Sequence, residues 1–168
     1  MTDAEMALIR RDEINDIIAH HKGRTCSTTF LLREEATDYA VKDAKDAYKY
    51  CSDLADHAQE AFVVLTLNQK NRIIGRHLVS LGSATATLIH PREVFRPAIL
   101  EGAASVMVVH NHPSGDPTPS SDDRRMTERL VEAAEILGIR LLDHVIIGDN
   151  QGSEYITPYF SFVDEGLM

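Results

Sequence analysis

Two histidines stand one residue apart in the stretch VVHNHPSGDPTPSSDDRR, which covers residues 108–125. In an extended segment, residues i and i+2 point to the same side, so His110 and His112 can converge on one point if the strand continues through Asn111. Asp123 lies in the first turn of a predicted helix, which the proline-rich loop can bring back over the strand end. Two imidazoles and one carboxylate form a common ligand set for catalytic zinc, with a fourth position left for water.

Several of these residues also have simpler interpretations. Ser120 and Asp123 have the spacing of a capping box at a helix start, with Asp in place of the usual Glu or Gln. Asp122 is rotated by about 100° from Asp123 on a helix, so we expect it at the surface or at the helix cap. We expect His90 at a helix entrance, and His144 in the core or beside the site, rather than as ligands.

The pattern of apolar residues and turn formers predicts the elements that must position these residues. It indicates an α/β sandwich with a mixed sheet, without internal repeats. The expected elements are a helix over 3–20, a strand over 24–32, a helix over about 43–58, a β-hairpin of strands 62–67 and 73–80, a helix over 91–101, a buried strand over 105–109, a loop over 110–120, a helix over 121–137, a strand over 139–149 and a weaker strand over 154–162.

Length and composition are typical of one globular domain with a short appendage, since the chain has 168 residues, 43% hydrophobic and 26% charged. No apolar run approaches the ~20 residues that span a bilayer, and the N-terminus lacks a signal-peptide pattern. Cys26 and Cys51 have no metal-binding or redox spacing, which favours reduced thiols in a cytoplasmic protein. The net charge of −9 argues against a broad DNA-binding face, although Arg124, Arg125 and Arg129 form a small basic group.

The order H-x-H-x7-S-x2-D over residues 110–123 resembles the JAMM motif of the MPN+ (JAB) metalloproteases. The string HNHPSGDPTPSSDD, with HPREVFRPAILEGAAS before it and LVEAAEILGIRLLDHVIIGD after it, closely resembles the RadC-like branch over about residues 57–150. This resemblance implies a cytidine-deaminase-like α-β-α sandwich with a mixed, largely antiparallel sheet. It places a RadC-like JAB domain at 43–168, after an N-terminal helix and strand extension at 1–42 that lacks the helix-hairpin-helix region common in RadC proteins.

The resemblance also implies roles for individual residues. The family holds its zinc on two histidines and an aspartate, which match His110, His112 and Asp123. The family's serine, which helps to stabilise the transition state, matches Ser120. Its general acid/base is a glutamate at the start of an earlier strand, and the matching residue is Glu60 in QEAFVVLTL.

Other glutamates compete with Glu60 for the role of the base. Glu60 has the alternative of a solvated helix end. Glu93 and Glu101 both fall on a predicted helix, and the favourable helix dipole explains Glu93 in the first turn without any catalytic role.

The function expected from the resemblance is zinc-dependent hydrolysis of a peptide or isopeptide bond, with a peptide or protein conjugate as substrate. The alternative is a DNA-repair or recombination accessory protein of the RadC type, with a structural or nuclease-linked metal. The acidic charge and the missing hairpin region favour the first. A catalytically silent MPN module is a third reading, against which the intact ligand set argues. The letters HNH at 110–112 do not indicate an HNH nuclease, whose named residues are scattered over a ββα motif.

Overall fold

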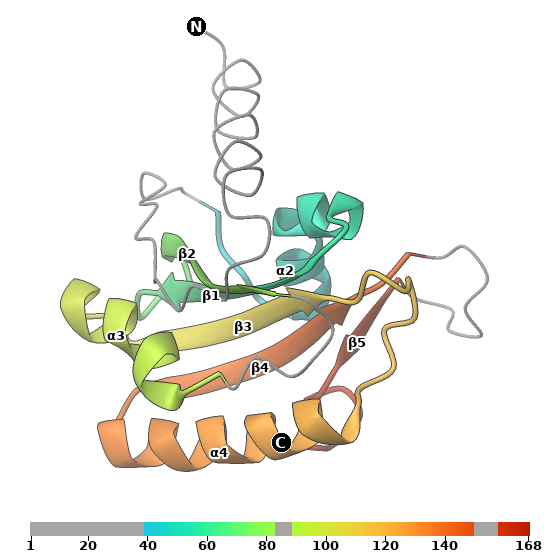
Figure 1. The fold of residues 1–168 in the computed structure, drawn as a ribbon. Helices are drawn as coiled ribbons and strands as arrows, with labels where there is room; N and C mark the ends of the chain where they lie inside the picture. The colour runs from blue at the N-terminus through green and yellow to red at the C-terminus, as the bar shows by residue number, and fades with distance from the viewer. Residues whose placement is uncertain (1–38, 83–88, 150–157) are drawn as a thin grey trace, which may run out of the picture.

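Five strands form one sheet with helices on both faces in the computed structural model (Figure 1), which describes residues 39–82, 89–149 and 158–168. The predicted helix at 3–20 and strand at 24–32 lie outside the described residues. The elements in chain order are α2 (Ala44–Tyr50), the 3-10 helix η1 (Ser52–Asp56), β1 (Glu60–Leu67), β2 (Ile73–Gly82), α3 (Pro91–Glu101), β3 (Ser105–Asn111), α4 (Ser121–Leu137), β4 (Arg140–Ile147) and β5 (Tyr159–Ser161).

The sheet is mixed and largely antiparallel, as predicted. Its strand order is β2-β1-β3-β4-β5, and β3 and β4 form the parallel pair. The other neighbours, β1 with β2, β1 with β3, and β4 with β5, are antiparallel. A parallel pair needs a crossover between its strands, and α4 provides it. In the unit β3-α4-β4, the start of α4 therefore lies near the C-terminal end of β3.

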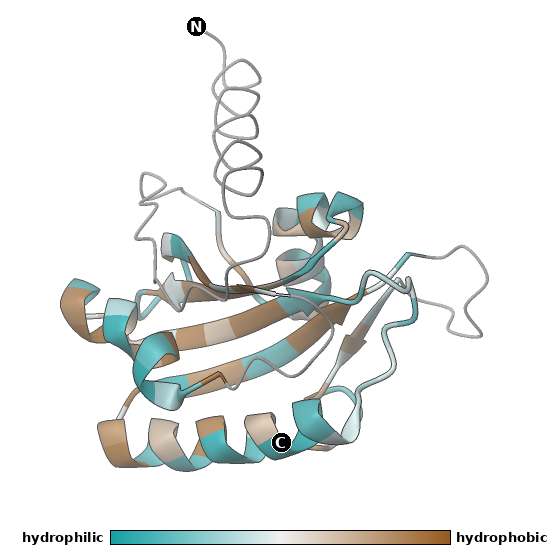
Figure 2. Ribbon diagram, viewed as in Figure 1, coloured by the Kyte–Doolittle hydropathy of each residue, from teal (hydrophilic) through white to brown (hydrophobic). Residues whose placement is uncertain are grey.

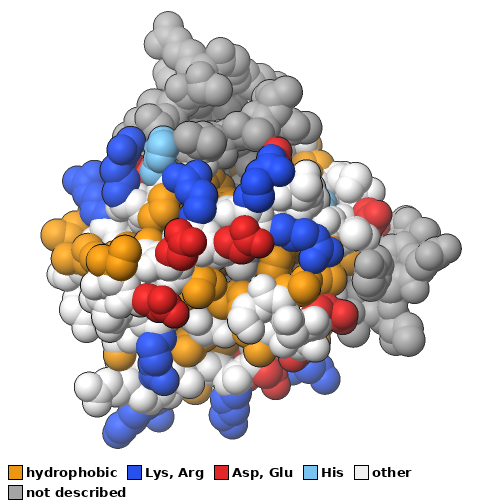
Figure 3. Space-filling model, turned by 90° about the horizontal axis from the view of Figure 1, so that it is seen from below, with side chains coloured by type: hydrophobic (Ala, Val, Ile, Leu, Met, Phe, Trp, Pro, Cys, Tyr) orange, Lys and Arg blue, Asp and Glu red, His pale blue; other side chains and the backbone are white. Residues whose placement is uncertain are grey.

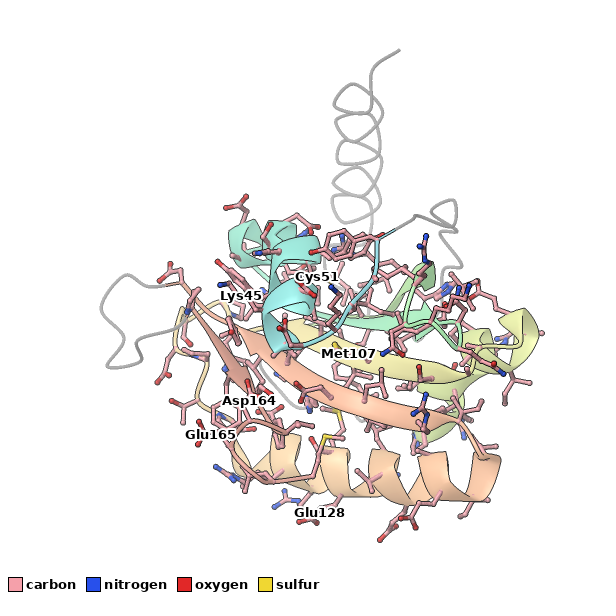
Figure 4. All side chains as sticks on the ribbon, turned by 180° about the vertical axis from the view of Figure 1, so that it is seen from behind. Lys45, Cys51, Met107, Glu128, Asp164 and Glu165 are labelled. Atoms are coloured by element: carbon pink, nitrogen blue, oxygen red, sulfur yellow. The ribbon has the colours of Figure 1, made fainter. Side chains whose placement is uncertain are left out.

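Two apolar cores lie on the two faces of the sheet, so the α/β sandwich is confirmed. One lies under α2 and η1, and the other lies between the sheet and the helices α3 and α4. The strands are accordingly largely brown in Figure 2, with teal segments where polar residues lie on them, and the helices alternate between teal and brown. Figure 4 shows Cys51 and Met107 on the α2 side of the sheet, while Glu128 points away from the sheet on the outer side of α4.

Most predicted elements have the predicted positions. The helices at 91–101 and 121–137 have the predicted bounds, and the β-hairpin is present. The predicted helix over 43–58 is divided, since α2 ends at Tyr50 and the chain continues as a 3-10 turn. Arg76 on β2 holds that turn by two hydrogen bonds to Asp53, at 2.9 and 2.7 Å. The expected last strand is short among the described residues, because β5 covers only Tyr159–Ser161.

The outer surface of α4 carries exposed charges of both signs. Arg124, Arg125 and Arg129 are exposed there, and so are Glu128 and Glu132. Figure 3, which views this side of the molecule from below, shows basic and acidic side chains interspersed rather than one continuous basic area. Within the three described stretches, no helix is long and apolar enough to cross a membrane.

Candidate metal centre

The candidate metal centre begins where β3 ends. The strand continues through Asn111, so the condition for His110 and His112 to share a side is met. Beyond the strand, the backbone N–H of His112 donates to the carbonyl of Ile147 at 2.9 Å, which keeps the chain beside β4. From there the loop descends to the start of α4 (Figure 1).

Close backbone packing holds this loop against the end of β4. The N–H of Asp149 donates to the carbonyl of Gly115 at 3.0 Å. A Cβ on Gly148 would lie only 2.2 Å from that same carbonyl oxygen, so this position has no room for a side chain. Gly115 itself has φ +83°, a conformation that L side chains rarely adopt. The loop path therefore depends on two glycines, and it fixes where α4 starts.

Helix α4 starts with the capping box that the sequence predicted. The N–H of Asp123 donates to Ser120 Oγ at 3.1 Å, and the N–H of Ser120 donates to Asp123 Oδ2 at 2.7 Å. Ser120 Oγ also donates to Asp123 Oδ2 at 2.6 Å. A hydroxyl has one hydrogen, so Ser120 gives it to the carboxylate in this arrangement. The role of Ser120 in stabilising a transition state stays a prediction.

His110, His112 and Asp123 come together with one ligand atom each, all within 4.8 Å of one another. His110 Nε2 lies 3.1 Å from His112 Nε2 and 3.4 Å from Asp123 Oδ1, and His112 Nε2 lies 3.6 Å from Asp123 Oδ2. His112 Nδ1 lies 2.7 Å from the carbonyl oxygen of Asp116. A carbonyl only accepts hydrogen bonds, so Nδ1 carries the hydrogen and the neutral ring keeps its lone pair on Nε2, toward the cluster.

The electrostatics of the cluster fit a cation. Burial and the neighbouring His144 lower the pKa of His110 well below its usual range. Burial alone would raise the pKa of Asp123, but the adjacent His112 and His110 rings and the hydrogen bonds from Ser120 hold it well below its usual range. His110 is therefore neutral and Asp123 ionised at neutral pH. Two nitrogen donors and one carboxylate, brought this close, match the donor set of a zinc site.

Glu60 lies beside this cluster, at the first position of β1. Phe62 pairs with His110 in the antiparallel register of β1 and β3, and extending that register by two residues sets Glu60 opposite His112. Burial is the main cause that raises the pKa of Glu60, the negative charge of Asp123 raises it further, and His112 partly lowers it. Glu60 is thus close enough to two of the candidate ligands to sense their charges.

The competing glutamates are engaged elsewhere. Glu93 lies in the first turn of α3 and pairs with Arg92 at 3.0 Å. Glu101 accepts a hydrogen bond from Thr66 at 2.5 Å and pairs with His77 at 3.1 Å. Thr66 is six residues along β1 from Glu60, which corresponds to about 20 Å of strand. Glu101 therefore lies far along β1 from the candidate ligands, whereas the pKa of Glu60 responds to Asp123 and His112.

The other polar residues considered in the sequence analysis are not among the candidate ligands. His90 is the N-cap residue of α3, as predicted for a helix entrance. Asp122 is exposed and pairs with Arg125 on the surface of α4. His144 is fully buried on β4, and burial lowers its pKa to about 3, so it is a neutral imidazole. His144 Nε2 lies 2.8 Å from His110 Nδ1, which places it directly behind a candidate ligand.

Asn111, between the two histidines, is a residue that sequence reasoning missed. Its Oδ1 accepts from the N–H of Ala61 at 2.7 Å, and its Nδ2 donates to the carbonyls of His57 and Gln59 at 3.3 and 3.2 Å. These partners lie on both sides of Glu60 in the chain. Asn111 therefore attaches the Glu60 segment to the strand that carries the histidines, and no local sequence pattern indicates a contact over 50 residues.

We expect Asn111→Ala to lower the free energy of unfolding by about 1–3 kcal/mol, because it leaves buried backbone groups without partners. Asn111→Asp keeps an acceptor for the N–H of Ala61 but replaces the amide donor by an oxygen beside two carbonyls, so it should not restore stability. Urea unfolding of both variants beside the wild-type protein measures this. Two variants as stable as the wild type would show that the three hydrogen bonds contribute nothing to holding this segment.

Comparison with known proteins shows the family of this chain. The model of the RadC-like JAB domain family matches residues 41–167. A UPF0758 protein of Trichlorobacter lovleyi is 53% identical over 116 residues, which are 69% of this chain and 47% of the relative. Another from Thermotoga maritima is 48% identical over 134 residues, 80% of this chain and 55% of the relative. The chain spans about half the length of the curated relatives that it matches. By this match and this fold, the chain belongs to the RadC-like JAB domain family.

Proposed function

We propose that this chain is a zinc-dependent hydrolase of a peptide or isopeptide bond. The observation that supports it most is the convergence of three metal-ligand atoms from His110, His112 and Asp123 beside Glu60. A site with three protein ligands leaves a coordination position for water or substrate, as catalytic zinc sites do. Structural zinc sites usually use four protein ligands, and the described residues supply three.

The ligand set favours zinc over magnesium and calcium. Imidazole nitrogen suits zinc, whereas magnesium and calcium prefer sites built from oxygen atoms alone. A zinc ion held there would supply a Lewis acid and would lower the pKa of a coordinated water to about 7. His110, His112 and Asp123 would hold it, and the rigid loop between β3 and α4 fixes their spacing.

Glu60 would act as the general base and then as the general acid. A raised pKa suits this exchange, because a base works best when its pKa lies near the operating pH. Glu60 takes the proton from the attacking water and returns it to the leaving amine. The Ser120 hydroxyl, at the N-terminus of α4, would donate to the developing oxyanion after turning away from Asp123.

The test combines metal content with cleavage. Protein purified without added metal should contain about one zinc per chain, and His112→Ala should reduce this strongly. Profiling against a library of peptides and ubiquitin-like conjugates should show cleavage by the wild-type protein that a chelator removes and zinc restores. Unchanged metal content in His112→Ala, or a zinc-loaded protein that cleaves no member of the library, would contradict the proposal.

A DNA-linked function is the competing outcome of the same set of measurements. Tight binding of duplex DNA near physiological salt, with a steep salt dependence, would favour it. We expect weak binding at most, because the chain has a net charge of −9 and the α4 face mixes both signs of charge.

The pH dependence of zinc binding follows from the ligands. Burial alone would lower the pKa of His112, but its hydrogen bonds with Asp123 and the Asp116 carbonyl, together with the charges of Asp123 and Glu60, raise it above its usual value. His110 is neutral and Asp123 ionised without metal, so His112 is the ligand that must lose a proton near neutral pH. Zinc affinity should therefore fall about tenfold per pH unit below the raised pKa of His112. Calorimetric titration in buffers of different ionisation enthalpy should show release of about one proton; pH-independent affinity would contradict this.

A further inference from the structure

A chain of hydrogen bonds runs from one candidate zinc ligand to another through the protein interior. His110 Nδ1 lies 2.8 Å from His144 Nε2, and His144 Nδ1 lies 2.6 Å from Thr127 Oγ1. Thr127 Oγ1 in turn lies 2.7 Å from the backbone carbonyl of Asp123, one helical turn earlier on α4. All four residues are buried, with Thr127 at 1% exposure and His110 and His144 at 0%.

The direction of each hydrogen bond in this series can be deduced by starting from the carbonyl of Asp123. A carbonyl oxygen only accepts, so the one hydrogen of the Thr127 hydroxyl lies between Thr127 Oγ1 and the carbonyl of Asp123. Thr127 must then accept from His144 Nδ1, which therefore carries the hydrogen. In a neutral imidazole the other nitrogen accepts, so His144 Nε2 receives the hydrogen of His110 Nδ1.

The consequence appears at the metal-facing atom. With its hydrogen on Nδ1, neutral His110 has a lone pair on Nε2, the atom 3.1 Å from His112 Nε2. With the other tautomer, His110 Nε2–H would donate to His112 Nε2. Neither nitrogen would then have a free lone pair with which to bind a metal. The second ring nitrogen of a ligating histidine sets its tautomer in this way, usually through a carboxylate, a carbonyl or water. Here the partner is another imidazole, and its own tautomer is set by a helix hydroxyl.

We propose that Thr127 and His144 form a relay that fixes the tautomer of His110 and so prepares the site for zinc. Both are positioning residues, since neither has an atom in the ligand cluster. The relay also joins β3, β4 and α4, because it starts at one ligand and ends at the backbone of another. His144 is oriented for this by Phe162, whose ring is stacked on it at 4.7 Å with an interplanar angle of 5°.

The relay rests on the zinc site of the proposed function but not on hydrolysis, and the experiment needs no substrate. Thr127→Val removes the hydroxyl at nearly constant volume, and Thr127→Ser restores it, so the two form a matched pair. His144→Phe removes the acceptor for His110 and keeps an aromatic ring against Phe162. Each folded protein is measured by zinc competition titration and, without metal, by long-range 15N–1H NMR of the imidazole rings, which reports the protonated nitrogen.

In the wild-type protein and in Thr127→Ser, we expect His110 to carry its hydrogen on Nδ1. Thr127→Val should mix the two tautomers of His110 and weaken zinc binding about tenfold, and His144→Phe should weaken it by about 10- to 100-fold. A residue that only filled space would change stability and leave the tautomer unchanged.

An Nε2–H tautomer of His110 in the metal-free wild-type protein would overturn the relay. So would equal zinc affinity and equal tautomers in Thr127→Val and Thr127→Ser. A protein that shows the expected tautomers but cleaves nothing would retain the relay and refute the hydrolase, so the two failures are distinguishable.

Discussion

The Glu60→Gln variant should keep its zinc and lose hydrolytic activity by a factor of about 10²–10⁴, the usual contribution of general acid–base catalysis. Glutamine has the size and hydrogen-bonding shape of glutamate, but it cannot take the proton from the attacking water. Glu60 is half-buried at the start of β1, and its segment is attached through Asn111 rather than through its own side chain. The fold should therefore change little, and the variant should keep its zinc content while its turnover falls.

Glu93→Gln provides the matched control for this variant. It makes the same chemical change in another half-buried glutamate, which forms an ion pair with Arg92 at the start of α3. It should retain both zinc and activity. Zinc content by elemental analysis and turnover on any substrate found by profiling are measured for both variants. If Glu60→Gln retained full activity, Glu60 would be no more than a carboxylate at the strand start, and the proposed mechanism would fail.

The fold was largely predictable because its signals are local. The bounds of α3 follow from Pro91 at its start and Gly102 after its end, and those of α4 follow from Ser120 and Gly138. The convergence of the candidate ligands was predictable for a related reason: His110 and His112 follow strand geometry, and the capping box sets Asp123 relative to Ser120. The division of the helix over 43–58 was not predictable, since it involves Arg76, which comes from a different element.

The supporting residues of the site lacked any local signal. Asn111 acts on backbone groups about 50 residues away, and His144 meets His110 across 34 residues of sequence. Both contacts depend on strand register, which a single sequence does not give. His144 was expected in the core or beside the site, but its direct contact with His110 required the parallel pairing of β3 and β4. The sequence therefore did not reveal how the candidate ligands are held in place.

Asp123→Asn and Ser120→Ala should separate metal binding from helix capping, because Asp123 caps α4 and is also a candidate metal ligand. The asparagine side-chain oxygen can still accept from the N–H and Oγ of Ser120, so the capping box survives. A neutral amide oxygen is a poor zinc ligand, so Asp123→Asn should weaken zinc binding by at least about 100-fold, beyond the 10- to 100-fold typical of residues that only support a ligand. In a chelator, its free energy of unfolding should stay close to that of the wild type.

Ser120→Ala should show the opposite balance. It leaves the carboxylate in place but removes the hydroxyl that accepts from the N–H of Asp123 at 3.1 Å. Loss of such a cap costs about 0.5–2 kcal/mol of stability. Zinc affinity should fall by no more than about tenfold, because the Ser120 N–H still holds Asp123 Oδ2 at 2.7 Å. Zinc competition titrations and urea unfolding in chelator measure both quantities for both variants. Equal zinc affinity in Asp123→Asn and the wild-type protein would remove Asp123 from the ligand set and leave it as a helix cap alone.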